Sequence, residues 1–306
     1  MKKCIIIMNP ESGKVKSLSS KKSFYDILRK YGYDAEIKYT KGPKDATRIV
    51  KELEDDVDLV ISAGGDGTLN EVVTGDIQRK KGLVLANLPM GTTNDVANMY
   101  GYTKDYQKNL EMLLQGVRKK VDVCYVDDTP FVYVACLGDY IDMAYNTPRS
   151  LKKKYGKIAY ILYGLRQLRN KIHKYNVKYY VDGKEHEGKY SFFFITNSSR
   201  VAGVDDIYYD VKMDDNMFEV ALANPKTKAD ILRMLVQVTM KDVKEVPGIT
   251  YYQTNNFKIE FLDKPKTSWC IDGEEYPHKG PVFEFKVNQS VKMLIPKTNA
   301  KKLFEE

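Results

Sequence analysis

The sequence has no long hydrophobic run, which argues against a chain that crosses a membrane through helices. None of its apolar stretches approaches the length of about 20 residues that spans a bilayer. The apolar run at residues 4–8 follows two lysines but stops at Asn9-Pro10, and no small-residue cleavage site comes after it. A buried strand is therefore predicted there instead of a signal peptide, and we expect a cytoplasmic protein.

Cysteine and histidine are scarce and scattered. The four cysteines, Cys4, Cys124, Cys136 and Cys270, show no C-x-x-C spacing, and the three histidines lie equally far apart. This pattern favours reduced structural thiols over zinc ligands or disulfides. It gives no sign of a histidine-based triad or metal site.

Acidic residues are missing from residues 149–178, where ten lysines and arginines occur without any Asp or Glu. The formal net charge of the chain is +8. A solvated helix face would explain such a stretch, and so would an anionic partner, either a phospholipid surface or the phosphates of a nucleotide. A nucleic-acid partner is not expected.

The first part of the chain alternates strand-like and helix-like segments, which predicts an α/β domain with a parallel sheet. Ligands of such sheets bind at the carboxyl ends of the strands. The predicted strands are residues 3–8, 35–39, 58–63 and 82–87, and the predicted helices are residues 23–31, 45–53, 69–73 and 106–114.

The pattern then changes to short segments rich in β-branched and aromatic residues, which predicts an antiparallel sandwich or barrel. We expect two domains, residues 1–127 and 128–289, with a C-terminal tail at about 290–306 that packs back on the first. The predicted later strands are residues 131–137, 175–181, 191–197, 217–223, 256–261, 268–271 and 282–287, and the predicted later helices are residues 156–172 and 226–240.

A glycine-rich turn directly after the strand at residues 58–63 is the strongest motif. It reads Gly-Gly-Asp-Gly-Thr-Leu-Asn-Glu at residues 64–71 and leads into a predicted helix. Glycines let backbone N–H groups approach an anion closely, and the following helix offers its positive end. A tight turn needs glycine too, but the order strand, glycine-rich turn and helix favours phosphate binding.

Two further turns follow predicted strands at the same edge of the sheet. One reads Asn-Pro-Glu-Ser-Gly-Lys at residues 9–14, which lacks P-loop spacing and is by itself more typical of a plain polar turn. The other reads Gly-Thr-Thr-Asn-Asp at residues 91–95 and could cap a helix or hydrogen-bond a phosphate. The convergence of three such turns is more informative than any one of them.

Two acidic turns occur later in the chain. Asp272-Gly273-Glu274 is equally well interpreted as a hairpin turn, which Asp-Gly favours, and as the position of a general base. Asp214-Asp215-Asn216 is more typical of an Asx turn than of a cation site.

Taken together, these motifs resemble the diacylglycerol kinase catalytic domain family, and within it the soluble bacterial lipid kinases. The motifs at residues 9–13, 64–71, 91–95 and 272–274 occur in the family's order across nearly the whole chain. The resemblance implies a nucleotide domain similar to those of NAD kinases and 6-phosphofructokinases, followed by an antiparallel β-sandwich domain. It implies transfer of the γ-phosphate of ATP, with Mg²⁺, to the hydroxyl of a membrane lipid, diacylglycerol giving phosphatidic acid.

The resemblance also implies a nucleotide site in the first domain. Asp66 would belong to a magnesium–phosphate network, with Asn94, Asp95 and Asp122 nearby. The residues implied to line the ATP site are Asn9, Pro10, Glu11, Ser12, Gly13, Lys14, Thr40, Gly65, Asp66, Gly67, Thr68, Leu69, Asn70, Glu71 and Thr92.

The catalytic and metal residues implied by the resemblance lie later in the chain. Glu274 is the implied catalytic base, with Asp272 as its competitor or metal partner. A structural magnesium site would fall at Lys212, Asp215 and Met217. The chain departs from the family pattern there, because Asn216 stands where glycine is usual and Lys212 occupies a position where a small polar residue could help bind the metal.

Other functions remain open on the sequence. The acceptor could be another lipid (phosphatidylglycerol, ceramide or a sphingoid base), and less favoured alternatives are an NAD kinase and a non-catalytic nucleotide- or lipid-binding regulator. The motifs at residues 91–95 and 272–274 favour the lipid kinase over the NAD kinase.

We expect peripheral contact with an anionic membrane through the lysines at residues 152–154 and the helix after them. A homodimer is compatible with the resemblance.

Overall fold

A computed structural model describes residues 1–12, 21–138, 172–276 and 280–305. The chain divides into two compact units, which are described separately below. Except for Ile172, the helix predicted at residues 156–172 lies outside the described residues, as does the lysine cluster at residues 152–154. Unit 1 consists of Met1–Val123, Lys212–Asp215 and Asn288–Glu306, and unit 2 of Cys124–Val211 and Asn216–Val287.

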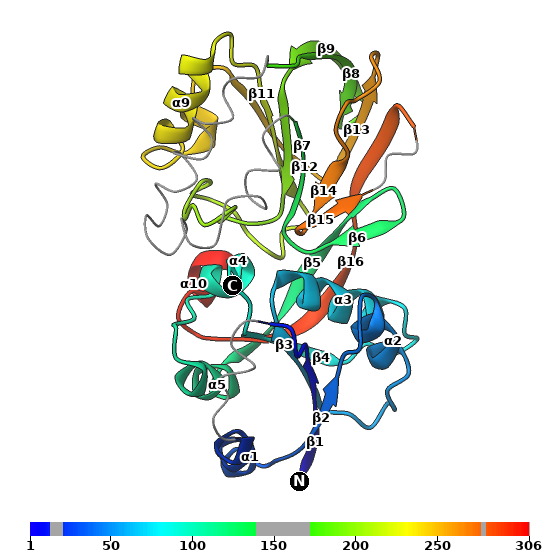
Figure 1. Cartoon of the computed structure of the whole chain (residues 1–306), viewed down its shortest axis with the longest axis vertical. Helices are drawn as coiled ribbons and strands as arrows, with labels where there is room; N and C mark the ends of the chain where they lie inside the picture. Colours follow the sequence, from blue (N-terminus) through cyan, green and yellow to red (C-terminus); the bar gives the residue numbers. More distant parts are fainter. Residues whose placement is uncertain (13–20, 139–171, 277–279, 306) are drawn as a thin grey trace. The chain divides into compact units, whose positions relative to one another are not determined.

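Unit 1 is built around a parallel sheet with the strand order β2-β1-β3-β4-β16 (Figure 1). The strands are β1 (Lys2–Met8), β2 (Tyr33–Tyr39), β3 (Leu59–Gly64), β4 (Val84–Pro89) and the last part of β16 (Val282–Ile295). In the middle of the sheet Ile6 pairs with Ile37 on one side and with Ile61 on the other. The central strands β1 and β3 are almost continuously apolar because both faces of the sheet are covered. The predicted parallel α/β domain is confirmed.

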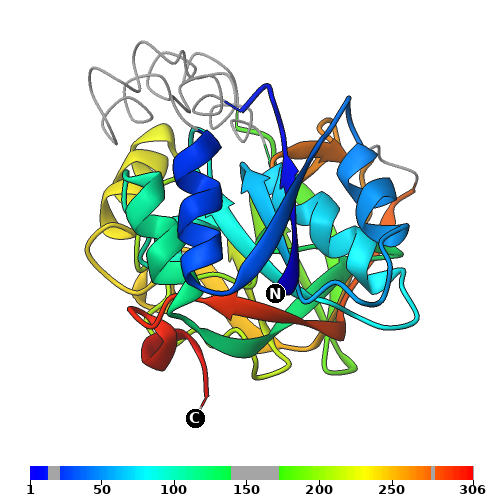
Figure 2. The same ribbon diagram turned by 90° about the horizontal axis from the view of Figure 1, so that it is seen from below.

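Helices cover both faces of this sheet (Figure 2). On one face α1 and α5 pack together, and Phe24 stacks on Tyr106 with ring centroids 5.9 Å apart. On the other face α2 packs against α3. The helices of unit 1 are α1 (Lys21–Lys30), α2 (Asp45–Lys51), α3 (Asp66–Ile77), α4 (Asp95–Met99), α5 (Tyr106–Leu114) and α10 (Ala300–Leu303).

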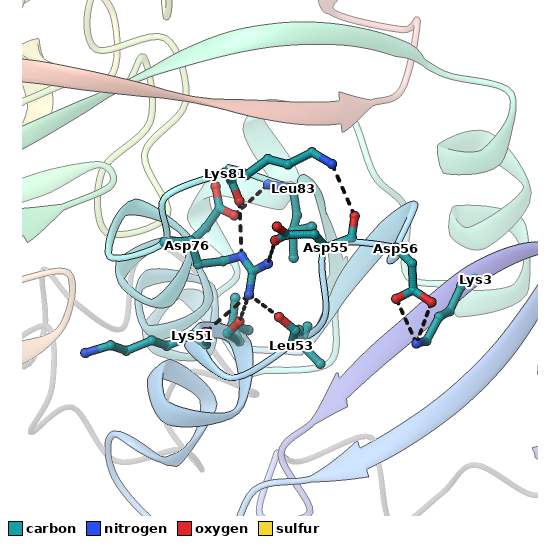
Figure 3. A network of polar contacts seen from close by, with 10 residues as sticks. Lys3, Lys51, Leu53, Asp55, Asp56, Asp76, Lys81 and Leu83 are labelled. Atoms are coloured by element: carbon teal, nitrogen blue, oxygen red, sulfur yellow. Dashed lines mark hydrogen bonds and ion pairs between the residues drawn. The ribbon is translucent and has the colours of Figure 1, made fainter.

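A buried arginine bonds to the C-terminal end of α2, in the network of polar contacts that includes Lys51, Leu53 and Asp55 (Figure 3). The side chain of Arg79 is 4% exposed, and its Nη1 donates to the carbonyls of Val50, Lys51 and Leu53. Its Nη2 lies 2.6 Å from Asp55 Oδ1. The last carbonyls of a helix have no i+4 partner within the helix, and this guanidinium supplies a charged donor to them, in addition to the N–H of Leu53 that Val50 O already accepts.

The C-terminal tail is part of unit 1. The N–H of Met213 donates to Leu303 O, and Met213 O accepts from the N–H of Asp122 in β5 (Val117–Val126). The ammonium of Lys212 lies 3.1 Å from Lys302 O and 3.2 Å from Phe304 O. The short segment Lys212–Asp215 therefore joins β5 to the tail.

Unit 2 consists of two antiparallel sheets. One contains β9, β8, β13 and the first part of β16, together with the β5–β6 hairpin, and the other has the order β12-β11-β10-β7-β14-β15. The remaining elements are β6 (Thr129–Phe131), β7 (Val134–Gly138), β8 (Tyr175–Val181), β9 (Lys184–Tyr190), β10 (Phe192–Thr196), β11 (Phe218–Ala223), β12 (Ile249–Thr254), β13 (Asn256–Phe261), β14 (Trp269–Ile271), β15 (Glu274–Tyr276), α9 (Lys228–Gln237) and the 3₁₀ turn η2 (Val243–Glu245).

Side chains from both sheets share one aromatic core. Trp269, which is fully buried, lies within 5.0–6.4 Å of the ring centroids of Phe193, Phe283 and Phe285. Two antiparallel sheets that enclose a common core form a β-sandwich. The predicted antiparallel sandwich is confirmed.

Candidate active site

The predicted phosphate-binding turns of unit 1 all follow the carboxyl ends of parallel strands. Asn9 follows β1, Thr40 follows β2, Gly65 follows β3 and Gly91 follows β4. After β1 the chain adds β2 on one side and β3 on the other, so the strand order reverses between β1 and β3. Open parallel sheets bind their ligands at such a point. The structure thus brings these turns to one edge of the sheet.

The two glycine turns are in backbone contact. Gly64 O accepts hydrogen bonds from the N–H groups of Met90 and Gly91, at 2.8 and 3.1 Å. A Cβ atom added to Gly91 would lie 2.6 Å from Gly65 Cα, and one added to Gly64 would lie 2.3 Å from the Thr68 hydroxyl. Glycine is therefore required at Gly64 and Gly91 by close approach, since neither position has room for a side chain.

The carboxylate of Asp66 joins the same two turns. Its two oxygens accept from the N–H groups of Asp95 and Val96, at 2.9 and 3.2 Å, and so cap the start of α4. Asn94 adopts a left-handed conformation (φ 50°) and its amide bonds to both backbone groups of Gly91. The predicted neighbourhood of Asp66, Asn94 and Asp95 is present in unit 1. Asp122 is buried in β5 and bonded through its N–H to Met213 O.

The turn after β1 is anchored to β3. The N–H of Asn9 donates to Ala63 O at 3.2 Å, its Oδ1 accepts from the N–H of Glu11, and its Nδ2 lies 3.5 Å from Thr68 Oγ1. Ser12 is buried and its N–H donates to Asn9 O at 3.1 Å. The side chain of Asn9 thus orders this turn and touches the glycine-rich turn. Gly13 and Lys14 lie outside the described residues.

Later residues of the glycine-rich motif hold the helices around it. Leu69 is fully buried in the core, and Asn70 accepts from Thr74 Oγ1 at 3.4 Å. The carboxylate of Glu71 accepts from the N–H groups of Lys44 and Ala46, at 2.8 and 3.0 Å, and so caps the start of α2. Thr92 is exposed on the turn after β4.

In unit 2 the Asp272-Gly273-Glu274 motif forms a tight hairpin between β14 and β15. Ile271 pairs with Glu274, and the two residues between them have positive φ angles of 45° and 106°. Asp and Gly are the residues that favour such a turn. Glu274 is exposed, whereas Asp272 is 4% exposed.

The buried carboxylate of Asp272 is bonded to the backbone that leads into β7. Its Oδ2 accepts from the N–H of Val132 at 2.5 Å, and its Oδ1 accepts from those of Tyr133 and Val134, each at 3.0 Å. The N–H of Asp272 donates to Val134 O at 2.8 Å. Of the two candidate carboxylates, only that of Glu274 is exposed to solvent.

A pair of cysteines lies close to this hairpin, in the pairing of β7 with β14. Cys136 and Cys270 are neighbours across β7 and β14, and both are buried with free thiols. The hydrogen bond from Cys270 and burial raise the pKa of Cys136 well above its ordinary value. A thiol in this state is protonated at neutral pH, which argues against a nucleophilic cysteine beside the hairpin.

The predicted metal residues lie where the chain enters β11. Asp215 is half-buried, the ammonium of Lys212 bonds to the tail carbonyls described above, and Met217 directly precedes β11. Asn216 has φ 59°, the left-handed conformation that asparagine adopts more readily than most residues, so it can replace a glycine there. One carboxylate and main-chain carbonyls are oxygen donors of the kind that Mg²⁺ prefers. Within the described ranges, no group of three or more His, Cys, Asp or Glu side chains is placed to hold a metal.

The comparisons with known proteins agree with these motifs. Residues 3–126 match the model of the diacylglycerol kinase catalytic domain, and residues 142–294 match that of the YegS C-terminal NAD kinase beta sandwich-like domain. A diacylglycerol kinase from Bacillus subtilis (strain 168) is 30% identical over 99% of both chains. The chain belongs to the diacylglycerol kinase catalytic domain family. It is therefore a kinase by family.

Other members of the family are similar over almost their whole length. A diacylglycerol kinase from Staphylococcus aureus (strain MRSA252) is 27% identical over 96% of this chain and 93% of its own. The crystal structure of a diacylglycerol kinase from Bacillus anthracis str. Sterne has a TM-score of 0.77 at 23% identity, and covers 98% of this chain and 99% of that chain. This likeness supports the fold of the family. No helix among the described residues is long and apolar enough to cross a membrane.

Proposed function

We propose that the protein transfers the γ-phosphate of ATP to a lipid hydroxyl, and that its acceptor is diacylglycerol, giving phosphatidic acid. The observation that carries this proposal is the set of contacting turns at the carboxyl edge of the unit 1 sheet, in a chain whose relatives bear the name diacylglycerol kinase. Phosphoryl transfer is catalysed mainly by positioning and by neutralising charge, which suits a site built from backbone turns.

Unit 1 would bind the nucleotide. The turns that begin at Asn9, Gly65 and Gly91 would surround the phosphates, and the first turn of α3, which starts directly after Gly65, would offer its backbone N–H groups. The N-terminus of a helix and a glycine-rich turn before it favour a phosphate group. Because Asp66 holds the two glycine turns together, its carboxylate would fix the shape of this cradle.

Glu274 would act as the general base. Its carboxylate is exposed at the end of a rigid hairpin, so a lipid hydroxyl can reach it and give up its proton as the phosphoryl group arrives. Removal of such a base lowers the rate by about 10²- to 10⁴-fold.

Mg²⁺ would be held by oxygen donors of this chain. Asp215 and the carbonyls of Lys212 and Met217 suit a structural ion, and Asp66 with Asp95 suits the ion that accompanies ATP. When bound, Mg²⁺ neutralises charge on the phosphates. Peripheral contact with an anionic membrane would bring the protein to its lipid substrate.

The proposal is tested by phosphate transfer from radiolabelled ATP, with Mg²⁺, to a panel of lipids in mixed micelles. We expect label in phosphatidic acid when diacylglycerol is present. Label in phosphatidylglycerol, ceramide or a sphingoid base instead would change the acceptor and keep the reaction. Label in NAD alone would identify an NAD kinase, and ATP binding without any transfer would identify a non-catalytic regulator.

A further inference from the structure

We infer that Asp272 is a positioning residue that fixes the hairpin carrying Glu274, and that it is not itself the base. This inference rests on the proposed function, because it concerns the proton-accepting step of phosphoryl transfer. It separates the roles of two carboxylates that stand two residues apart in one motif.

The bonding of the Asp272 carboxylate carries the inference. An ionised carboxylate has about four lone-pair positions, and three of them accept backbone N–H groups here. The side chain is 4% exposed. Burial, together with these three hydrogen bonds, leaves a substrate hydroxyl little access to an oxygen of Asp272. The exposed carboxylate of Glu274 imposes no such restriction.

The conformation of the turn explains why a carboxylate is needed at Asp272. The residue turns into the left-handed region (φ 45°), so β14 ends and its backbone leaves β7. The N–H of Val134 then bonds to the Asp272 side chain, while Val134 O still accepts from the N–H of Asp272. The Asp272 carboxylate therefore takes the place of a backbone carbonyl as the acceptor for Val134 N–H, at the point where β14 turns away from β7. Buried N–H groups left without such an acceptor would destabilise the turn.

The hydrogen bonds of the Asp272 carboxylate also attach the β14–β15 hairpin to a strand inside a sheet. β7 lies between β10 and β14, so the backbone that Asp272 holds is fixed on two sides. Glu274 is the first residue after the turn and pairs with Ile271. Its position is thus set by the turn that Asp272 fastens. A displacement of about 1 Å at a reacting group can lower the rate by about 100-fold.

The experiment compares Asp272→Asn, Glu274→Gln and the matched control Asp128→Asn in diacylglycerol phosphorylation. Asp128 is an exposed aspartate of another hairpin turn in unit 2. Asparagine keeps one acceptor oxygen but turns an N–H₂ group toward an N–H donor. We expect Asp272→Asn to lower kcat by about 10- to 100-fold, with the KM for ATP unchanged. The acidic limb of its pH–rate profile should persist, because the Glu274 carboxylate is still present.

The outcomes separate the alternatives. Loss of the acidic limb in Asp272→Asn, with its persistence in the residual activity of Glu274→Gln, would make Asp272 the base and overturn the inference. An unchanged kcat with only a lower Tm would reduce Asp272 to a structural role and also overturn it. If wild-type protein phosphorylates no lipid at all, the proposed function fails as well, which the panel of lipids detects independently.

A second variant guards against misfolding of Asp272→Asn. Gly273→Ala leaves the Asp272 carboxylate intact and strains the turn, since φ is 106° at this position. We expect it to lower kcat at unchanged KM for ATP. Full activity in Gly273→Ala would contradict a role for the turn in placing Glu274.

Discussion

Replacing Arg79 by methionine should destabilise unit 1 markedly. The guanidinium uses Nη1, Nη2 and Nε to bond the carbonyls of Val50, Lys51 and Leu53 at the end of α2, the carboxylate of Asp55 and a further carbonyl. At about 1 kcal/mol for each of three donor groups, the loss in unfolding free energy is about 3 kcal/mol. With an unfolding entropy of about 2.1 cal/mol/K per residue over 306 residues, that corresponds to a fall in Tm of about 5 °C.

The assay is urea unfolding followed by far-UV circular dichroism, with Arg48→Met as the matched control. Arg48 also forms ion pairs, with Asp45 and Glu52, but its side chain is 55% exposed. Exposed ion pairs contribute little to stability, so the control should shift the midpoint only slightly. Equal shifts for Arg79→Met and Arg48→Met would refute the reasoning, because burial of the guanidinium would then have no consequence.

Two further predictions concern the same unit. Burial raises the pKa of Asp76, and the hydrogen bond from the N–H of Leu83 partly opposes this shift. The folded protein therefore keeps the Asp76 proton to a higher pH than the unfolded chain does. As a result, the free energy of unfolding falls as pH rises through the folded-state pKa of Asp76. Asp76→Asn should therefore be more stable than wild type at pH 7 and equal to it at pH 3, by thermal unfolding at both values. Gly91→Ala should weaken ATP binding at least about 10-fold by calorimetry, since its Cβ would press on Gly65, while Gly42→Ala, with nothing within 4 Å, should bind ATP normally.

The sequence predicted the parallel sheet well because its strands are dense apolar runs. Residues 4–8 of β1 are all buried, and the glycine-rich turn followed β3 as expected. Strand β9 was missed because it reads Lys-Glu-His-Glu-Gly-Lys-Tyr and is largely exposed, so it carries no apolar alternation. The last part of β16 was missed because Asn288 and its polar neighbours interrupt the pattern, yet these exposed residues continue the strand to Ile295.

The roles of individual carboxylates could not be predicted, because they depend on contacts between distant residues. The place of Glu71 at the ATP site, implied by the resemblance, stays a prediction; what the sequence did not reveal is that its carboxylate caps α2 through Lys44, 27 residues away. Asp272 bonds to Val132, which is 140 residues away. No local spacing encodes such pairings. The role of Asn9 at the ATP site also stays a prediction, and its contact with Thr68 in the glycine-rich motif is again one between distant residues.

The most direct test of the account is the initial rate of phosphate transfer from ATP to diacylglycerol by wild-type protein and by Glu274→Gln. Both proteins should bind ATP equally, because the nucleotide is assigned to unit 1. The account predicts labelled phosphatidic acid from the wild type and a rate lower by about 10²- to 10⁴-fold in the variant. No labelled lipid from the wild type, or an undiminished rate in Glu274→Gln, would contradict it.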